Sequence, residues 1–208
     1  MKKDLTEIVF ILDRSGSMAN VVDDTIGGFN SLLKKHQELP GECLVSTVLF
    51  DNDSEVLHDR LDIKDIKPIT SKEYYVRGCT ALLDAIGGAI HHIGNIHKYI
   101  RNEDVPEKTI FVVTTDGMEN ASKNYDYKKV KEMIERQQSK YQWEFIFLGA
   151  NIDACREANR IGINKDFVME YENNTNGITK QYECMSEAIR QTRFEKKVSK
   201  NWKNNKNN

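Results

Sequence analysis

Residues 8–18 read Ile-Val-Phe-Ile-Leu-Asp-Arg-Ser-Gly-Ser-Met, and this stretch decides how the rest of the chain is interpreted. Its five leading apolar residues, rich in β-branched and aromatic types, predict a strand buried on both faces. Asp13, Ser15 and Ser17 follow at once, at the carboxyl end of that strand. In open α/β sheets this edge is where ligands bind. Oxygen donors without thiolate or imidazole suit Mg2+, Mn2+ or Ca2+ rather than zinc.

Composition is that of an ordinary globular protein. The chain has 208 residues, 39% hydrophobic and 30% charged, with a formal net charge of −2. We expect one domain over residues 1–195 and a Lys- and Asn-rich tail over 196–208 that frays. The near-neutral charge indicates no binding to nucleic acid or to an anionic membrane. No apolar run is long enough for a membrane span and the N-terminus fails as a signal peptide, so we expect a cytoplasmic protein. Buried free thiols are expected at Cys43 and Cys184.

Hydrophobic periodicity predicts strands that alternate with helices. Further strands are expected at 42–50, 55–63, 108–115, 143–151 and 166–171. Helices are expected at 20–38, from residue 80 to about 100, and at 126–140, 153–160 and 176–194. The cluster 51–54 predicts a hairpin turn leading into an exposed edge strand. A Ca2+ loop there is the less favoured alternative, because the glycine and distant glutamate of an EF-hand are missing. The alternation predicts an α/β fold with a mostly parallel sheet covered on both faces.

Two later segments supply more oxygen donors. The apolar run 108–115 ends in Asp116, an acid that is costly to bury unless paired or bound to a metal. Thr80 precedes a helical pattern and, taken alone, is better explained as an N-cap. If strands 8–13 and 109–115 are neighbours where the chain direction reverses, one crevice collects five ligands: Asp13, Ser15, Ser17, Thr80 and Asp116. The residues expected to flank this site are Arg14, Gly16, Gly78, Gly117 and Asn151.

Asp13-x-Ser15-x-Ser17, followed by Thr80 and Asp116, resembles the metal-ion-dependent adhesion site of von Willebrand factor type A domains, and the surrounding segments look like bacterial, intracellular-type members. The resemblance covers residues 5–190. It implies a Rossmann-like, doubly wound, mostly parallel six-stranded sheet with one antiparallel edge strand. It also implies that the serines bind Mg2+ or Mn2+ directly, with Ca2+ less favoured, and that Thr80 and the aspartates bind directly or through water. A partner protein then presents an Asp or Glu side chain to the metal.

The alternative is a Mg2+-dependent phosphatase or phosphotransferase with Asp13 as nucleophile. Such chemistry wants a second acid two residues on, but that position is Ser15. A serine nucleophile needs a positioned base, and none of the five histidines falls at a predicted strand end. We therefore expect a metal-dependent protein-binding module without catalytic residues. The sequence does not indicate an oligomeric state.

Overall fold

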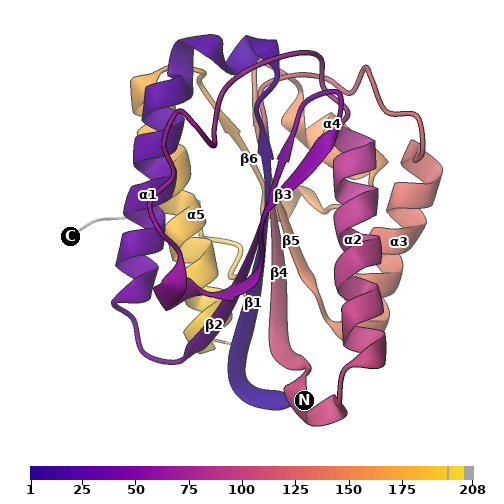
Figure 1. The fold of residues 1–208 in the computed structure, drawn as a ribbon. Helices are drawn as coiled ribbons and strands as arrows, with labels where there is room; N and C mark the ends of the chain where they lie inside the picture. Colours follow the sequence, from indigo (N-terminus) through magenta and orange to yellow (C-terminus); the bar gives the residue numbers. More distant parts are fainter. Residues whose placement is uncertain (196, 204–208) are drawn as a thin grey trace.

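The computed structural model describes residues 1–195 and 197–203. The described residues form one sheet in the order β3-β2-β1-β4-β5-β6 (Figure 1). The strands are β1 (Lys2–Asp13), β2 (Glu42–Phe50), β3 (Ser54–Asp62), β4 (Pro106–Thr115), β5 (Glu144–Ala150) and β6 (Val168–Tyr171). Every neighbouring pair is parallel except β2 and β3. The predicted doubly wound sheet with one antiparallel edge strand is therefore confirmed.

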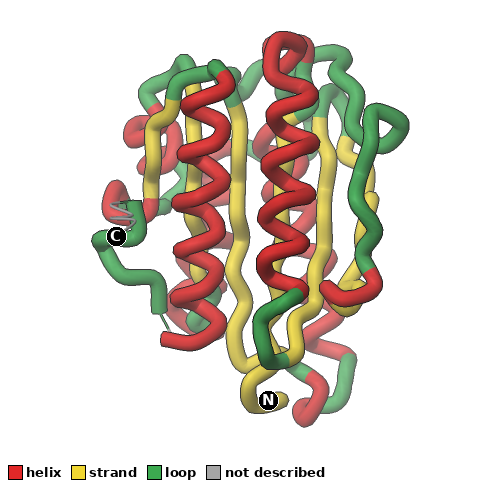
Figure 2. Tube along the Cα trace, turned by 90° about the vertical axis from the view of Figure 1, so that its left-hand side faces the viewer, coloured by secondary structure: helices red, strands yellow, loops and turns green. Residues whose placement is uncertain are grey.

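Five α-helices lie on the two faces of the sheet among the described residues. They are α1 (Val22–Gln37), α2 (Leu82–Tyr99), α3 (Tyr127–Tyr141), α4 (Ala154–Arg160) and α5 (Thr175–Glu195). α1 and α5 cover one face, where they lie along the strands (Figure 2), and α2 and α3 cover the other. None of the described helices is both long and apolar enough to cross a membrane.

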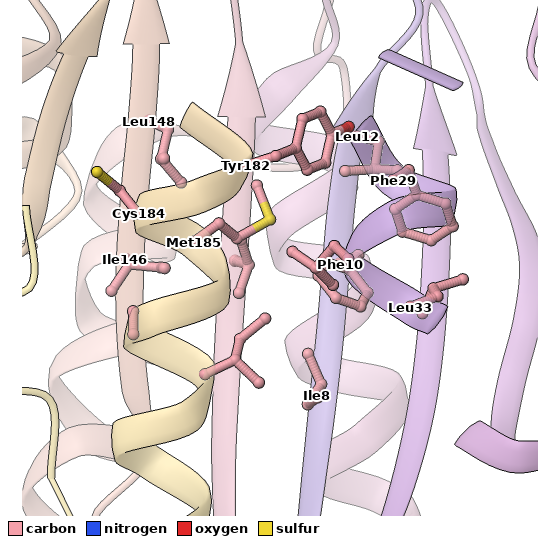
Figure 3. Close-up of a cluster of buried hydrophobic side chains, with 14 of the residues drawn as sticks. Ile8, Phe10, Leu12, Phe29, Leu33, Ile146, Leu148, Tyr182, Cys184 and Met185 are labelled. Carbon is pink, nitrogen blue, oxygen red and sulfur yellow. The ribbon is translucent and has the colours of Figure 1, made fainter. Parts of the chain in front are cut away.

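Two apolar clusters fill the space between the sheet and its helices, because inward residues of β1 alternate between the faces. Ile8, Phe10 and Leu12 point toward α1 and α5 (Figure 3), whereas Val9 and Ile11 belong to the cluster under α2 and α3. The rings of Phe10 and Phe29 meet edge to face at 5.2 Å between centroids. A strand buried on both faces thus lies at the centre of the sheet, as the opening run predicts.

The contact between α1 and α5 explains one of two adjacent glycines in α1. Gly28 faces α5, where a methyl group in place of its hydrogen would lie 2.2 Å from the ring of Tyr182. Gly27 is exposed, and nothing described outside its own helix lies within 4 Å of the same position.

The prediction of a fraying tail is wrong for residues 197–203. Val198 and Trp202 are buried in the cluster beneath α5, and the indole Nε1 of Trp202 donates to the carbonyl of Asp166 at 2.9 Å. An aromatic side chain that buries its ring and satisfies its N–H anchors the segment. Residue 196 and residues 204–208, which the same prediction included, lie outside the described residues. Cys43 and Cys184 are buried free thiols, as expected.

Candidate metal centre

The carboxyl ends of β1 and β4 lie side by side at one edge of the sheet, at the top of Figure 1. Asp13 is the last residue of β1, and Asp116 directly follows β4. Sheet order reverses between these two strands, since β2 lies on the outer side of β1 and β5 on the outer side of β4. The crevice expected at such a point is therefore built from the segments that the sequence indicates.

Hydroxyl and carboxylate oxygens meet in this crevice. The Oγ atoms of Ser15 and Ser17 are 3.1 Å apart, and Ser17 Oγ donates to Asp116 Oδ1 at 2.5 Å. A methyl group on Gly117 would lie 3.0 Å from Thr80 Oγ1 and 3.8 Å from Ser17 Oγ. The structure thus brings Ser15, Ser17 and Asp116 into contact and places the Thr80 hydroxyl beside them.

The side chain of Asp13, at the end of β1, is almost fully buried. Its Oδ1 accepts from the backbone N–H of Ser15 at 2.7 Å and its Oδ2 from Thr115 Oγ1 at 2.6 Å. Burial raises the pKa of Asp13 to about 6, because these hydrogen bonds offset only part of the lost hydration of the carboxylate. Burial likewise raises the pKa of Asp116. Two carboxylates in a desolvated crevice favour a nearby positive charge.

Thr80 is not the N-cap that the sequence suggests when the residue is taken alone. α2 begins at Leu82, and its first N–H groups are bound by the following loop: Leu83 donates to Glu119 at 2.9 Å and Asp84 to Ser122 Oγ at 3.0 Å. The helix end is therefore satisfied without the Thr80 side chain. This leaves the Thr80 hydroxyl available to the crevice.

Backbone and side-chain hydrogen bonds join the loop of Thr80 to the loop of the two serines. Gly16 N donates to the carbonyl of Gly78 at 3.1 Å. Gly78 has a φ of +66°, and a methyl group there would lie 2.0 Å from Asn52 Oδ1, which accepts from Cys79 N. Only glycine fits this backbone conformation and this close approach. The two glycines predicted to flank the site therefore hold its two loops together.

Arg14 flanks the centre from inside the protein rather than from its opening. Its fully buried guanidinium donates to Asp51 at 2.7 Å and to Glu55 at 2.8 Å. Asp51 also accepts from Arg77 at 2.8 Å. The antiparallel pairing of β2 and β3 confirms the predicted hairpin turn, in which Asp51 binds both arginines. This network fixes the turn against the loop that carries Thr80.

Asn151, also predicted to flank the site, directly follows β5 and has a φ of +54°. It lines a cleft of about 700 Å3 at the carboxyl ends of β5 and β6, together with Asp153, Glu170 and Lys180. Asp153 also caps α4 by accepting from Arg156 N at 2.9 Å. No contact of Asn151 with the five predicted ligands is found among the described residues.

Sequence patterns did not identify four residues that contact the ligands. Thr115 binds Asp13, and Tyr74 donates its hydroxyl hydrogen to the Asp13 carbonyl at 2.5 Å. Asn120 binds the Thr80 backbone twice, accepting from its N–H at 2.9 Å and donating to its carbonyl at 3.1 Å. Asn173 donates to Asp116 Oδ2 at 2.7 Å. Loop asparagines carry no periodicity; the positions of Thr115 and Asn120, next to Asp116 and four residues after it, were the available signals for this edge.

No histidine or cysteine takes part. His97 contacts the buried Glu7 at 2.5 Å and His92 contacts Asp59 at 2.9 Å, both far along α2 from its first turn. Among the described residues no three His, Cys, Asp or Glu side chains gather as a metal cluster. The candidate centre is a different kind of site, with two carboxylates and three hydroxyls.

Comparison with known proteins gives the fold a name. No protein-family model and no curated protein matches the chain. Solved structures do match. One is a D319A mutant of the PilB minor pilin of Streptococcus sanguinis, with a TM-score of 0.63 and 13% identity over 90% of this chain and 62% of that one. Another is the ArnB paralog VWA2 of Sulfolobus acidocaldarius, with a TM-score of 0.55 and 20% identity over 90% of this chain and 45% of that one. The chain has the von Willebrand factor type A fold. A third similar structure is mussel proximal thread matrix protein 1, described with a zinc-occupied metal-ion-dependent adhesion site motif. Its TM-score is 0.60, with 15% identity over 87% of this chain and 44% of that one. The chain spans less than two thirds of each of these three proteins.

Proposed function

We propose that this von Willebrand factor type A chain is a divalent-metal-dependent protein-binding module. The observation that carries the proposal is the convergence of five oxygen-bearing side chains, from three segments far apart in sequence, at the carboxyl ends of β1 and β4. Asp13, Ser15 and Ser17 come from the first segment, Thr80 from the second and Asp116 from the third.

The donor set fits a small hard cation. Mg2+ prefers oxygen ligands at about 2.0–2.1 Å in octahedral geometry, which sets neighbouring oxygens about 2.9 Å apart. The Ser15–Ser17 and Ser17–Asp116 oxygen pairs lie at 3.1 and 2.5 Å, around that spacing. A bound Mg2+ or Mn2+ would offset the burial of both carboxylates and would attract a further acidic oxygen. Because three of the five ligands are neutral hydroxyls, the two carboxylates balance but do not exceed the charge of such a cation.

Asp13 is better suited to ligand binding than to nucleophilic attack. Both of its oxygens are occupied by hydrogen bonds, and its side chain is almost fully buried. A carboxylate nucleophile needs an oxygen that can approach the substrate. The two hydrogen-bonded oxygens of Asp13 therefore support a module that binds rather than a phosphatase that uses Asp13.

We propose that the partner is a protein that presents an Asp or Glu side chain to the metal centre. We also propose a cytoplasmic location for the chain, since Cys43 and Cys184 are free thiols as befits a reducing compartment.

Affinity capture tests this function. Immobilised wild-type chain should retain a protein from lysate in Mg2+ or Mn2+ and release it in chelator, and the Ser15→Ala/Ser17→Ala double variant should retain none. Carboxylate-to-amide variants of the captured partner should identify its acidic residue. Retention that is equal with and without metal would contradict the proposal. Turnover of a phosphorylated substrate by wild type, lost in Asp13→Asn, would favour an enzyme instead.

A further inference from the structure

Asn173 lies between the end of β6 at Tyr171 and the start of α5 at Thr175. Its Nδ2 donates to Asp116 Oδ2 at 2.7 Å, while Asp116 Oδ1 accepts from Ser17 Oγ. The two oxygens of Asp116 are thus held by different partners. One oxygen faces the hydroxyl cluster and the other faces the segment that enters the last helix.

The orientation of the Asn173 amide is fixed by this contact, because only its NH2 end can donate to a carboxylate. The other end of the amide, Oδ1, is buried and has no hydrogen-bond partner among the described residues. A buried acceptor without a partner lowers fold stability. Asn173 is therefore poorly explained as a residue selected for stability alone.

The neighbouring residue already performs the structural task at this helix end. Asn174 Oδ1 accepts from Gly177 N at 2.9 Å and its Nδ2 donates to Glu172 at 2.8 Å. Thr175 Oγ1 ties the same turn to Asp24 of α1 at 2.9 Å. The start of α5 is thus ordered without the Asn173 side chain, which leaves Asn173 to serve Asp116.

We infer that Asn173 is a positioning residue of the metal centre, which holds Asp116 so that its Oδ1 faces the hydroxyls of the crevice. This inference rests on the proposed function. Residues that hydrogen-bond a metal-ligating carboxylate orient it, and their loss typically weakens metal affinity about 10–100-fold. The pair Asn173 and Asn174 allows the positioning role to be separated from loop order, since the two side chains are adjacent but bind different groups.

Calorimetric titration of the full chain with Mn2+ tests the inference, with circular dichroism to show that each variant is folded. Asn173→Ala and the similarly sized Asn173→Leu should each bind Mn2+ about 10–100-fold more weakly than wild type. Asn174→Ala should bind as wild type does, although α5 loses its cap. The thermal midpoint without metal should fall more for Asn174→Ala than for Asn173→Leu, because only the former loses a helix cap.

Unchanged Mn2+ affinity in both Asn173 variants would overturn the inference, as would an equal loss in Asn174→Ala, which would indicate general loosening of the loop. The Ser15→Ala/Ser17→Ala variant separates the two levels of the account. If wild type binds Mn2+ and the double-serine variant does not, the metal centre stands and the Asn173 result judges the inference alone. If wild type binds no Mn2+, the proposed function fails and the inference fails with it.

Discussion

The contact between α1 and α5 can be tested with two adjacent glycines that have different surroundings. Gly27 faces solvent, whereas Gly28 faces the buried ring of Tyr182. Alanine at either position gains helix propensity of about 0.8–1.0 kcal/mol over glycine in a helix interior. Helix propensity alone therefore predicts that both substitutions stabilise the protein.

The packing at the two positions differs enough to give opposite signs. Nothing described outside α1 lies within 4 Å of an added methyl at position 27, so Gly27→Ala should keep the full gain. At position 28 the methyl would lie 2.2 Å from a ring carbon of Tyr182, and the buried ring has to move. Overpacking of this kind costs about 1–3 kcal/mol, so Gly28→Ala should be neutral to destabilising by up to about 2 kcal/mol after the propensity gain.

Urea unfolding of the two variants measures this difference. We expect Gly27→Ala to raise the transition midpoint and Gly28→Ala to leave it unchanged or lower it, with unchanged denaturant dependence. The two free energies of unfolding should then differ by about 1–3 kcal/mol. An equal stabilisation by both substitutions would refute the close approach of α5 to α1. It would also question the position of α5, whose entry segment carries Asn173.

Two further predictions concern buried ionisable side chains. Burial lowers the pKa of His36 from 6.5 to about 4. As the pH falls, the unfolded chain therefore takes up a proton at this histidine before the native chain does. The free energy of unfolding should fall by up to about 3 kcal/mol as the pH drops from 6.5 to 4. His36→Gln should remove this part of the acid sensitivity in urea midpoints measured across that range, and an identical pH slope in the variant would contradict it. Asp51→Ala leaves the half-exposed Glu55 as the remaining ion-pair partner of the buried Arg14 guanidinium and should cost about 3–5 kcal/mol. Arg77→Ala, at the exposed end of the same network, should cost far less, because solvent screens its contact with Asp51. Equal effects of these two substitutions would show that burial does not control the network.

Strands, helices and turns were predicted from the sequence, because each follows from the residue pattern of its own segment. The apolar run 8–12 predicted the central strand, and the turn cluster 51–54 predicted the antiparallel edge. The order of strands and helices is confirmed. The site ligands Ser15, Ser17 and Asp116 do meet, since strand ends share one edge of the sheet; their metal binding stays a prediction.

Features that depend on contacts between loops could not be predicted. Thr80 looks like a helix cap in sequence, and only the fold shows that Glu119 and Ser122 take that role instead. Asn173 lies 57 positions from Asp116, so no local pattern connects them. Trp202 lies in a polar tail whose composition suggests disorder, yet the burial of Val198 and Trp202 and the hydrogen bonds of Val198 N to Glu144 and of the Trp202 indole to Asp166 anchor residues 197–203. In each case tertiary contacts outweigh the composition of the surrounding segment.

The central claim is that the oxygens at the carboxyl ends of β1 and β4 bind one divalent cation. Titration of metal-free wild-type chain with Mn2+, followed by the loss of the free-ion electron paramagnetic resonance signal, measures this directly. We predict one Mn2+ bound per chain, displaced by Mg2+, and no binding by the folded Ser17→Ala or Asp116→Ala variants. Binding of equal strength in these variants, or no saturable binding by wild type, would contradict the account.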